Sequence, residues 1–192
     1  MQMTDKELWD FLTATGAAVV HLSHYAVMDP TRPIWPEDMR RAIAQKDDFN
    51  LSCVVVWPGH SMSLPGSVGV IFKPTCATVI SAACSDSGST MLPDGSDGSA
   101  GLPLSPETLA STFDAKIGGY NEWRVNGAEV VGIFVADPSN IVVKKDVVLN
   151  VDGHEFKDVG ATSIALDEVL AAFPDHSVFT MGPAGLIEIP GS

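Results

Sequence analysis

The stretch GGYNEWRVNGAEVVGIFV, residues 118–135, contributes most to the expected fold. Residues 120–125 and 129–135 are rich in aromatic and β-branched side chains, and Asn126-Gly127 stands between them. Asn-Gly between two β-prone runs is the strongest short-range signal for a tight hairpin turn. We therefore expect residues 118–135 to form a β-hairpin, in which Gly118-Gly119 lets another backbone or a ligand approach closely.

Glu122 is the residue of this hairpin that suggests chemistry. It lies between Tyr120 and Trp123, inside a strand-like segment where a solvated charge has no evident structural task. A carboxylate fixed on a strand beside aromatic rings can stabilise positive charge that develops on a ligand. The structural alternative is an ion pair with Arg124, since residues i and i+2 of a strand lie on the same face. The sequence leaves both interpretations open.

Length and composition indicate a folded protein of ordinary domain size. The chain has 192 residues, of which 45% are hydrophobic, and we expect residues 1–192 to form a single domain. We find neither a secretory leader nor the run of about 20 apolar residues that spans a bilayer, so we expect a cytoplasmic protein without membrane contacts. Cys53, Cys76 and Cys84 form no CxxC motif, and we expect them to be reduced thiols.

The charge balance disfavours nucleic acid as a partner. Asp and Glu number 24 against 11 Lys and Arg, which gives a formal net charge of −13. Such a field repels phosphate backbones, because binding there needs Lys and Arg to displace counterions. A small nucleotide in a local pocket is compatible with it. No His or Cys cluster has zinc-site spacing, and Asp94 and Asp97 lack the pattern of a calcium loop, so we expect no metal site.

The order of expected elements favours an α+β fold. Thr4 and Glu7 form a capping box for an amphipathic helix over residues 4–15, which Gly16 ends, and Asp152-Gly153 is expected to form a β-turn. Further helices are expected over residues 37–46, 106–113 and 164–173, and strands over residues 17–22, 51–57, 67–73, 78–84, 141–149, 178–181 and 186–189. This order predicts a mainly antiparallel β core with an N-terminal helix and two or three short helices.

Polar residues follow two of the expected strands. His21 and Ser23 end the first one on the same face, where both can hydrogen-bond ribose hydroxyls or an amide, although a histidine in this place is also a common core residue. Ser87 and Ser89 follow a later strand, in a segment rich in Ser, Gly, Asp and Pro over residues 86–106. That length is typical of a functional loop, while the hydroxyls can equally cap a plain turn.

This order of features resembles the ADP-ribosyltransferase superfamily. A histidine closes an early strand, hydroxyl residues follow a middle strand, and Tyr120-Asn121-Glu122-Trp123 precedes an apolar strand, as in the glutamate strand of toxin-like members. The resemblance implies a split β core that binds NAD, with Glu122 as the catalytic acid and His21 as the residue that orients the ribose.

The same resemblance implies a set of residues around the bound nucleotide. They are Ser23, Ser87, Ser89, Tyr120 and Asn121. It further implies that the protein is a toxin or effector that transfers ADP-ribose from NAD to a protein target. Tyr120 stands where arginine-directed members carry a second acidic residue, which argues against arginine as the acceptor.

Two functions of other classes stay open. A compact acidic α+β protein can neutralise a basic partner, as an antitoxin or immunity protein does, and its charge would steer the association. A hydrolase is the other alternative. Gly59-His60-Ser61 has part of a nucleophile elbow but lacks the second glycine, and a cysteine could pair with His154 or His176.

Overall fold

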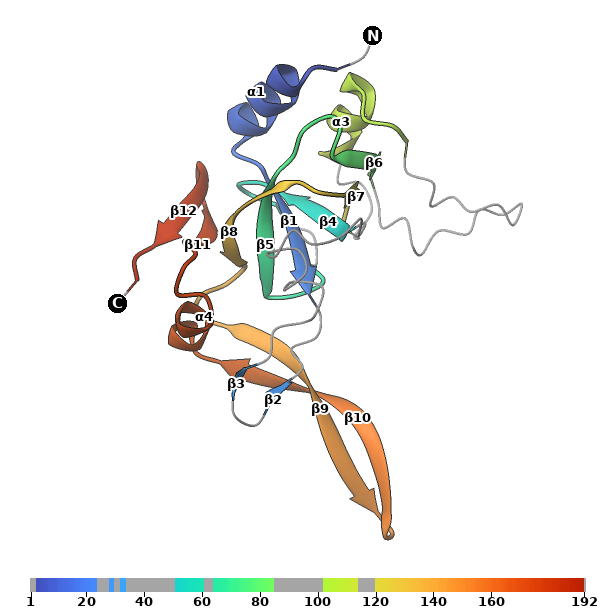
Figure 1. Ribbon diagram of the computed structural model, residues 1–192, viewed down its shortest axis with the longest axis vertical. Helices are drawn as coiled ribbons and strands as arrows, with labels where there is room; N and C mark the ends of the chain where they lie inside the picture. Colours follow the sequence, from blue (N-terminus) through green and yellow to red (C-terminus); the bar gives the residue numbers. More distant parts are fainter. Residues whose placement is uncertain are drawn as a thin grey trace, which may run out of the picture.

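The computed structural model describes residues 3–23, 28–29, 32–33, 51–60, 64–84, 102–113 and 120–191. Within these ranges an eight-stranded sheet, in the order β12-β11-β8-β5-β1-β4-β7-β6, forms the centre of the protein (Figure 1). Its strands are β1 (Ala18–Ser23), β4 (Leu51–Val56), β5 (Val68–Lys73), β6 (Val79–Ala83), β7 (Glu122–Val125), β8 (Glu129–Val135), β11 (Val178–Gly182) and β12 (Gly185–Ile189). Neighbours run antiparallel except β8 and β11, which are parallel. The expected α+β class with a mainly antiparallel sheet is confirmed.

Three helices lie in the described ranges, and their ends follow the capping signals. In α1 (Asp5–Thr15) the Thr4 hydroxyl accepts from the Glu7 N–H while the Glu7 carboxylate accepts from the Thr4 N–H, and Gly16 ends the helix at φ 63°. Ser105 caps α3 (Pro106–Thr112), and α4 (Leu166–Ala172) precedes the last two strands. The helix expected over residues 37–46 lies outside the described residues. A short ladder joins β2 (Met28–Asp29) to β3 (Arg32–Pro33).

The hairpin expected over residues 118–135 is wrong, although both of its strands exist. β7 pairs with β4 and β6, whereas β8 pairs with β5 and β11. Asn126 donates its N–H to the Thr78 carbonyl instead of closing a turn, and Gly127 has φ 67°. The Asn-Gly signal reports only a local turn preference. Here each strand forms its ladder with strands that lie far away in the sequence.

The connection over residues 126–128 shows that the sheet cannot be flat. Val125 and Glu129 are four residues apart, a length that spans at most about 14 Å. In a flat sheet β7 and β8 would lie four strand spacings apart, about 19 Å. The sheet therefore folds back, and β4 and β6 run across the direction of β1 and β5 (Figure 1). We call β4, β7 and β6 the three-stranded half, and the other strands the five-stranded half.

The core consists of two clusters, one on each face of the sheet. A main cluster joins side chains of both halves, among them Val19, Cys53 and Trp123, to residues of α1, α3 and α4. A second cluster, which includes Val20, Leu22, Val54, Val56 and Phe134, lies on the other face of the sheet. Side chains that alternate between the two clusters along one strand define the two faces.

A long hairpin projects from the sheet. It consists of β9 (Ile141–Val151) and β10 (His154–Ile164), joined by Asp152 and Gly153 at φ 52° and 83° (Figure 1). The expected turn is confirmed, but strand β10 was not predicted from the sequence. In the part of the chain that the structure describes, no helix has the length and apolar character that crossing a bilayer requires.

Gly132 allows the close contact between β8 and the chain that enters β11. A Cβ atom at this position would lie 2.5 Å from the Ser177 carbonyl oxygen and 2.7 Å from the Phe179 ring. We expect Gly132→Ala to lower the free energy of unfolding by about 2 kcal/mol, because such overpacking has to be relieved by movement of the backbone. Urea denaturation measures it. The control Val131→Ala, at an exposed neighbour, should cost less than about 1 kcal/mol; equal effects would contradict the steric explanation.

Candidate functional site

Glu122 is a buried carboxylate at the start of the middle strand of the three-stranded half. Its side chain is 4% exposed, and its Oε1 lies 3.7 Å from Nη2 of Arg124, whose side chain stays 42% exposed. Ala83 of β6 lies opposite Glu122, and one step along the register that pairs Cys53 with Trp123 places Val54 on its other side. The expected ion pair with Arg124 is therefore present, but the Glu122 carboxylate in it is buried and not exposed to solvent.

The same region disfavours Cys53 as a nucleophile. Burial and, to a smaller extent, the negative charge of Glu122 raise the pKa of the Cys53 thiol far above its usual range. The thiol therefore stays protonated at neutral pH, and only the thiolate is a strong nucleophile.

Asn121 fixes the position of Glu122. Its fully buried amide accepts a hydrogen bond from the Val55 N–H (2.7 Å) and donates one to the Val55 carbonyl (3.0 Å). The β4–β7 register would place Asn121 opposite Val55, so the side chain replaces the main-chain pair at this point. Trp123, the next residue but one, donates its indole N–H to the Thr112 hydroxyl of α3 at 2.9 Å. The expected nucleotide contact of Asn121 therefore competes with a structural task.

His21 lies where the two halves of the sheet part. The β1–β4 ladder pairs only Ala18–Val20 with Val54–Val56, and beyond it the His21 ring approaches β4, with Nδ1 2.7 Å from the Ser52 carbonyl oxygen. Val20 and Leu22 belong to the second cluster, so alternation along β1 directs His21, which is 7% exposed, to the other face. By the same alternation Glu122, which precedes Trp123 of the main cluster, lies on the face of Val54.

The other expected site residues are placed only in part. Tyr120 is half-buried and packs against the second cluster. Ser23 pairs with Val68 through its backbone, and its side chain, like Ser87 and Ser89, lies outside what the structure describes. Among the described residues no group of three His, Cys, Asp or Glu side chains could hold a metal ion. Comparison with known protein families, curated proteins and solved structures finds no match.

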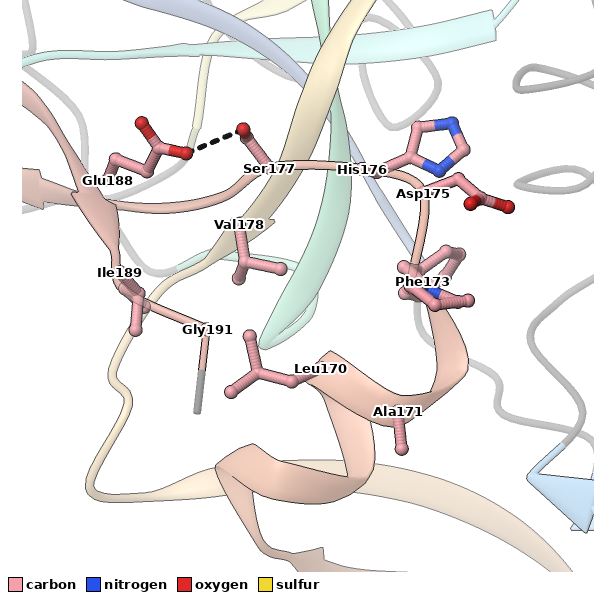
Figure 2. Close-up of a pocket in the computed structure, with 11 residues that line it drawn as sticks. Leu170, Ala171, Phe173, Asp175, His176, Ser177, Val178, Glu188, Ile189 and Gly191 are labelled. Carbon is pink, nitrogen blue, oxygen red and sulfur yellow. Dashed lines mark hydrogen bonds between the residues drawn. The ribbon is translucent and has the colours of Figure 1, made fainter.

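A groove that the sequence did not predict lies between α4 and strands β11 and β12. It has a volume of about 610 Å³, an apolar floor that includes Leu170 and Val178, and a polar rim (Figure 2). On this rim the Ser177 hydroxyl donates a 2.6 Å hydrogen bond to the Glu188 carboxylate, while the ring of His176 points away from both (Figure 2). A serine nucleophile needs a base beside it that is itself oriented, so these side chains do not form a hydrolase site.

His60 lines a smaller cavity of about 390 Å³. Nε2 of His60 is buried, and no residue that the structure describes forms a hydrogen bond with it. The imidazole meets the Trp57 ring edge-on, with 4.6 Å between the ring centroids. Burial lowers the pKa of His60. The neighbouring Ser61, the serine of the hydrolase alternative, lies outside the described residues. No local sequence signal marks this cavity, because the residues that line it come from distant segments.

Replacement of Asn121 distinguishes a structural residue from a ligand contact. We expect Asn121→Ala to lower the free energy of unfolding by roughly 2–4 kcal/mol, because it leaves the buried Val55 N–H and carbonyl without their partner. Urea denaturation without any ligand measures this loss. The exposed Asn140→Ala serves as control, and an Asn121→Ala protein as stable as this control would show that the amide is not structural.

The lowered pKa of His60 predicts how stability depends on pH. Above the ordinary histidine pKa of 6.5 both the folded and the unfolded forms carry a neutral imidazole. As the pH falls through 6.5 the His60 imidazole becomes protonated in the unfolded chain but stays neutral in the folded protein. The free energy of unfolding therefore decreases. We therefore expect His60→Phe to gain stability relative to wild type as the pH is lowered from 8 to 5.5. Urea titrations at each pH measure this change.

The exposed His154→Phe provides the control for that measurement. It should follow the wild-type pH dependence throughout. If the free energy of unfolding of His60→Phe also changes with pH as that of wild type does, the His60 imidazole is not protected from protonation in the folded protein.

Proposed function

We propose that the protein transfers or releases ADP-ribose from NAD, with Glu122 as the carboxylate that stabilises the reacting sugar. One observation carries this proposal: Glu122 is buried on a strand fixed by Asn121 and Trp123, beside a guanidinium that reaches solvent. A fixed charge in such surroundings stabilises charge that develops in the transition state, without the cost of reorienting water molecules during the reaction.

The chemistry requires a negative charge in one place. When the bond between nicotinamide and ribose breaks, its electron pair leaves with nicotinamide and positive charge develops on C1′ of the sugar. Water or a side chain of a target then bonds to C1′ and gives up its proton. One well-placed charge of this kind contributes about 10²–10³ in rate.

Arg124 supports the binding of an anionic substrate. A protein of net charge −13 does not attract NAD by its overall field, so a local cation has to meet the pyrophosphate. Arg124 offers one, because its guanidinium neighbours Glu122 and is still 42% exposed. Arginine is well suited to this contact, since its planar fork donates two parallel hydrogen bonds to phosphate oxygens.

His21 has a more demanding role in this proposal. Its ring is held by the Ser52 carbonyl at the point where β1 and β4 part. Because alternation directs His21 and Glu122 to opposite faces, the ribose-orienting role implied for His21 requires a ligand that reaches into this gap. The proposal therefore gives the electrostatic role to Glu122 alone.

Glu122→Gln tests the proposal with almost no change in shape. We expect release of nicotinamide from NAD, measured by chromatography, to fall by about 10²–10³-fold. The melting temperature should stay near that of wild type, because the remaining Arg124 is half-exposed and can be solvated.

Glu129→Gln is the matched control, since Glu129 also begins a strand but is exposed and only distantly paired with Lys73, at 4.0 Å. It should retain wild-type turnover. Turnover that persists in Glu122→Gln would reject the assignment of Glu122. A wild-type protein that neither binds nor consumes NAD would reject the proposed function as a whole.

A further inference from the structure

The His60 cavity is formed where three separate parts of the chain meet. Val56 and Trp57 come from the end of β4, and Leu64 from the segment that leads to β5. Phe134 and Met181 come from β8 and β11. The remaining described lining residues are Gly59, His60, Ala136, Gly182 and Pro183. At about 390 Å³ the cavity is within the range of roughly 300–1,000 Å³ that is typical of small-molecule sites.

The described part of the lining carries no formal charge, although the protein is strongly acidic. None of the ten described residues that line the cavity is Asp, Glu, Lys or Arg, although the chain has a net charge of −13. A cavity without charges favours an uncharged ligand, because a charged one would lose its hydration without gaining a partner. The indole, phenyl and thioether side chains favour a planar aromatic ring, which they can contact by stacking and by sulfur–ring interactions.

His60 supplies the polar group that such a site needs. Among the described residues its buried Nε2 has no hydrogen-bond partner, which is rare for buried polar atoms in native proteins and calls for an explanation. A ligand group in the cavity can provide the missing partner. Nε2 is covered by protein atoms, so the imidazole has to turn toward a ligand for the bond to form.

We propose that the His60 cavity binds an uncharged, planar aromatic molecule whose hydroxyl or amide group forms a hydrogen bond with His60 Nε2. This site is independent of the proposed role of Glu122. Glu122 is not among the lining residues, and the inference stands if the protein does not act on NAD.

Two ligands that differ by one hydroxyl group test the hydrogen bond. 2-Naphthol and naphthalene have the same planar ring system, and only the first can pair with Nε2. We expect wild type to bind 2-naphthol, and to bind it roughly 2–12-fold more tightly than naphthalene, as one net hydrogen bond allows. Titration followed by NMR gives both affinities, and the ¹⁵N shift of the His60 imidazole should change only with 2-naphthol.

Three variants locate the binding. His60→Phe should bind both ligands with nearly equal affinity, whereas the exposed His154→Phe should keep the wild-type preference. Ala136→Leu adds three carbon atoms to the wall of the cavity and should weaken both ligands at least 10-fold. This variant keeps the test decisive if His60→Phe fails to fold.

Two results would overturn the proposal. The first is that wild type binds neither ligand up to the limit of solubility. The second is that Ala136→Leu binds both as wild type does, which would place the binding elsewhere. Loss of NAD turnover in any Glu122 variant has no bearing on either result, so failure of this inference and failure of the proposed function are distinguishable.

Discussion

The three residues between β7 and β8 constrain the rest of the fold. Because a chain of this length cannot cross four strand spacings, the three-stranded half has to lie across the five-stranded half. The β1–β4 ladder, which pairs only three residues of each strand, joins the halves and lets them part beyond Val20. The main cluster then fills the space between the halves with side chains of both, under the cover of α1 and α3. This geometry also places Glu122, because the residue begins β7, the middle strand of the three-stranded half.

Much of this architecture could be predicted from local signals. The capping box of Thr4 and Glu7, the end of α1 at Gly16, and the turn at Asp152-Gly153 each depend on a few neighbouring residues. The pairing of strands does not. Asn126-Gly127 favours a hairpin by its own conformational preference, but the choice between pairing β7 with β8 or with β4 is decided by Trp123, Val125 and the rest of the main cluster. Strand β10 escaped prediction because Gly160, Ala161 and its charged residues lack β propensity, and only the long register with β9 makes it a strand.

The candidate site shows the same limit. An acidic residue between two aromatic ones singled out Glu122, and the spacing of two residues predicted its contact with Arg124. That the carboxylate is buried follows from long-range pairing with Ala83 and from the register with β4, which no local pattern contains. Asn121 is the clearest case. Its side chain takes the place of a main-chain pair with Val55, 66 residues away, so a residue expected to bind nucleotide is used to hold the strand.

Two polar side chains, Glu122 of β7 and His60 after the end of β4, lie near β4 on the same face of the sheet. Alternation places Glu122 beside Val54, and Val56, two residues further on the same face, lines the cavity of His60. Removing a carboxylate from water costs free energy, and so does burying an imidazole nitrogen that has no hydrogen-bond partner among the described residues. Arg124 offsets part of the first cost, because its guanidinium lies 3.7 Å from the Glu122 carboxylate. A ligand in the cavity of His60 would give the imidazole the hydrogen-bond partner that no described residue supplies.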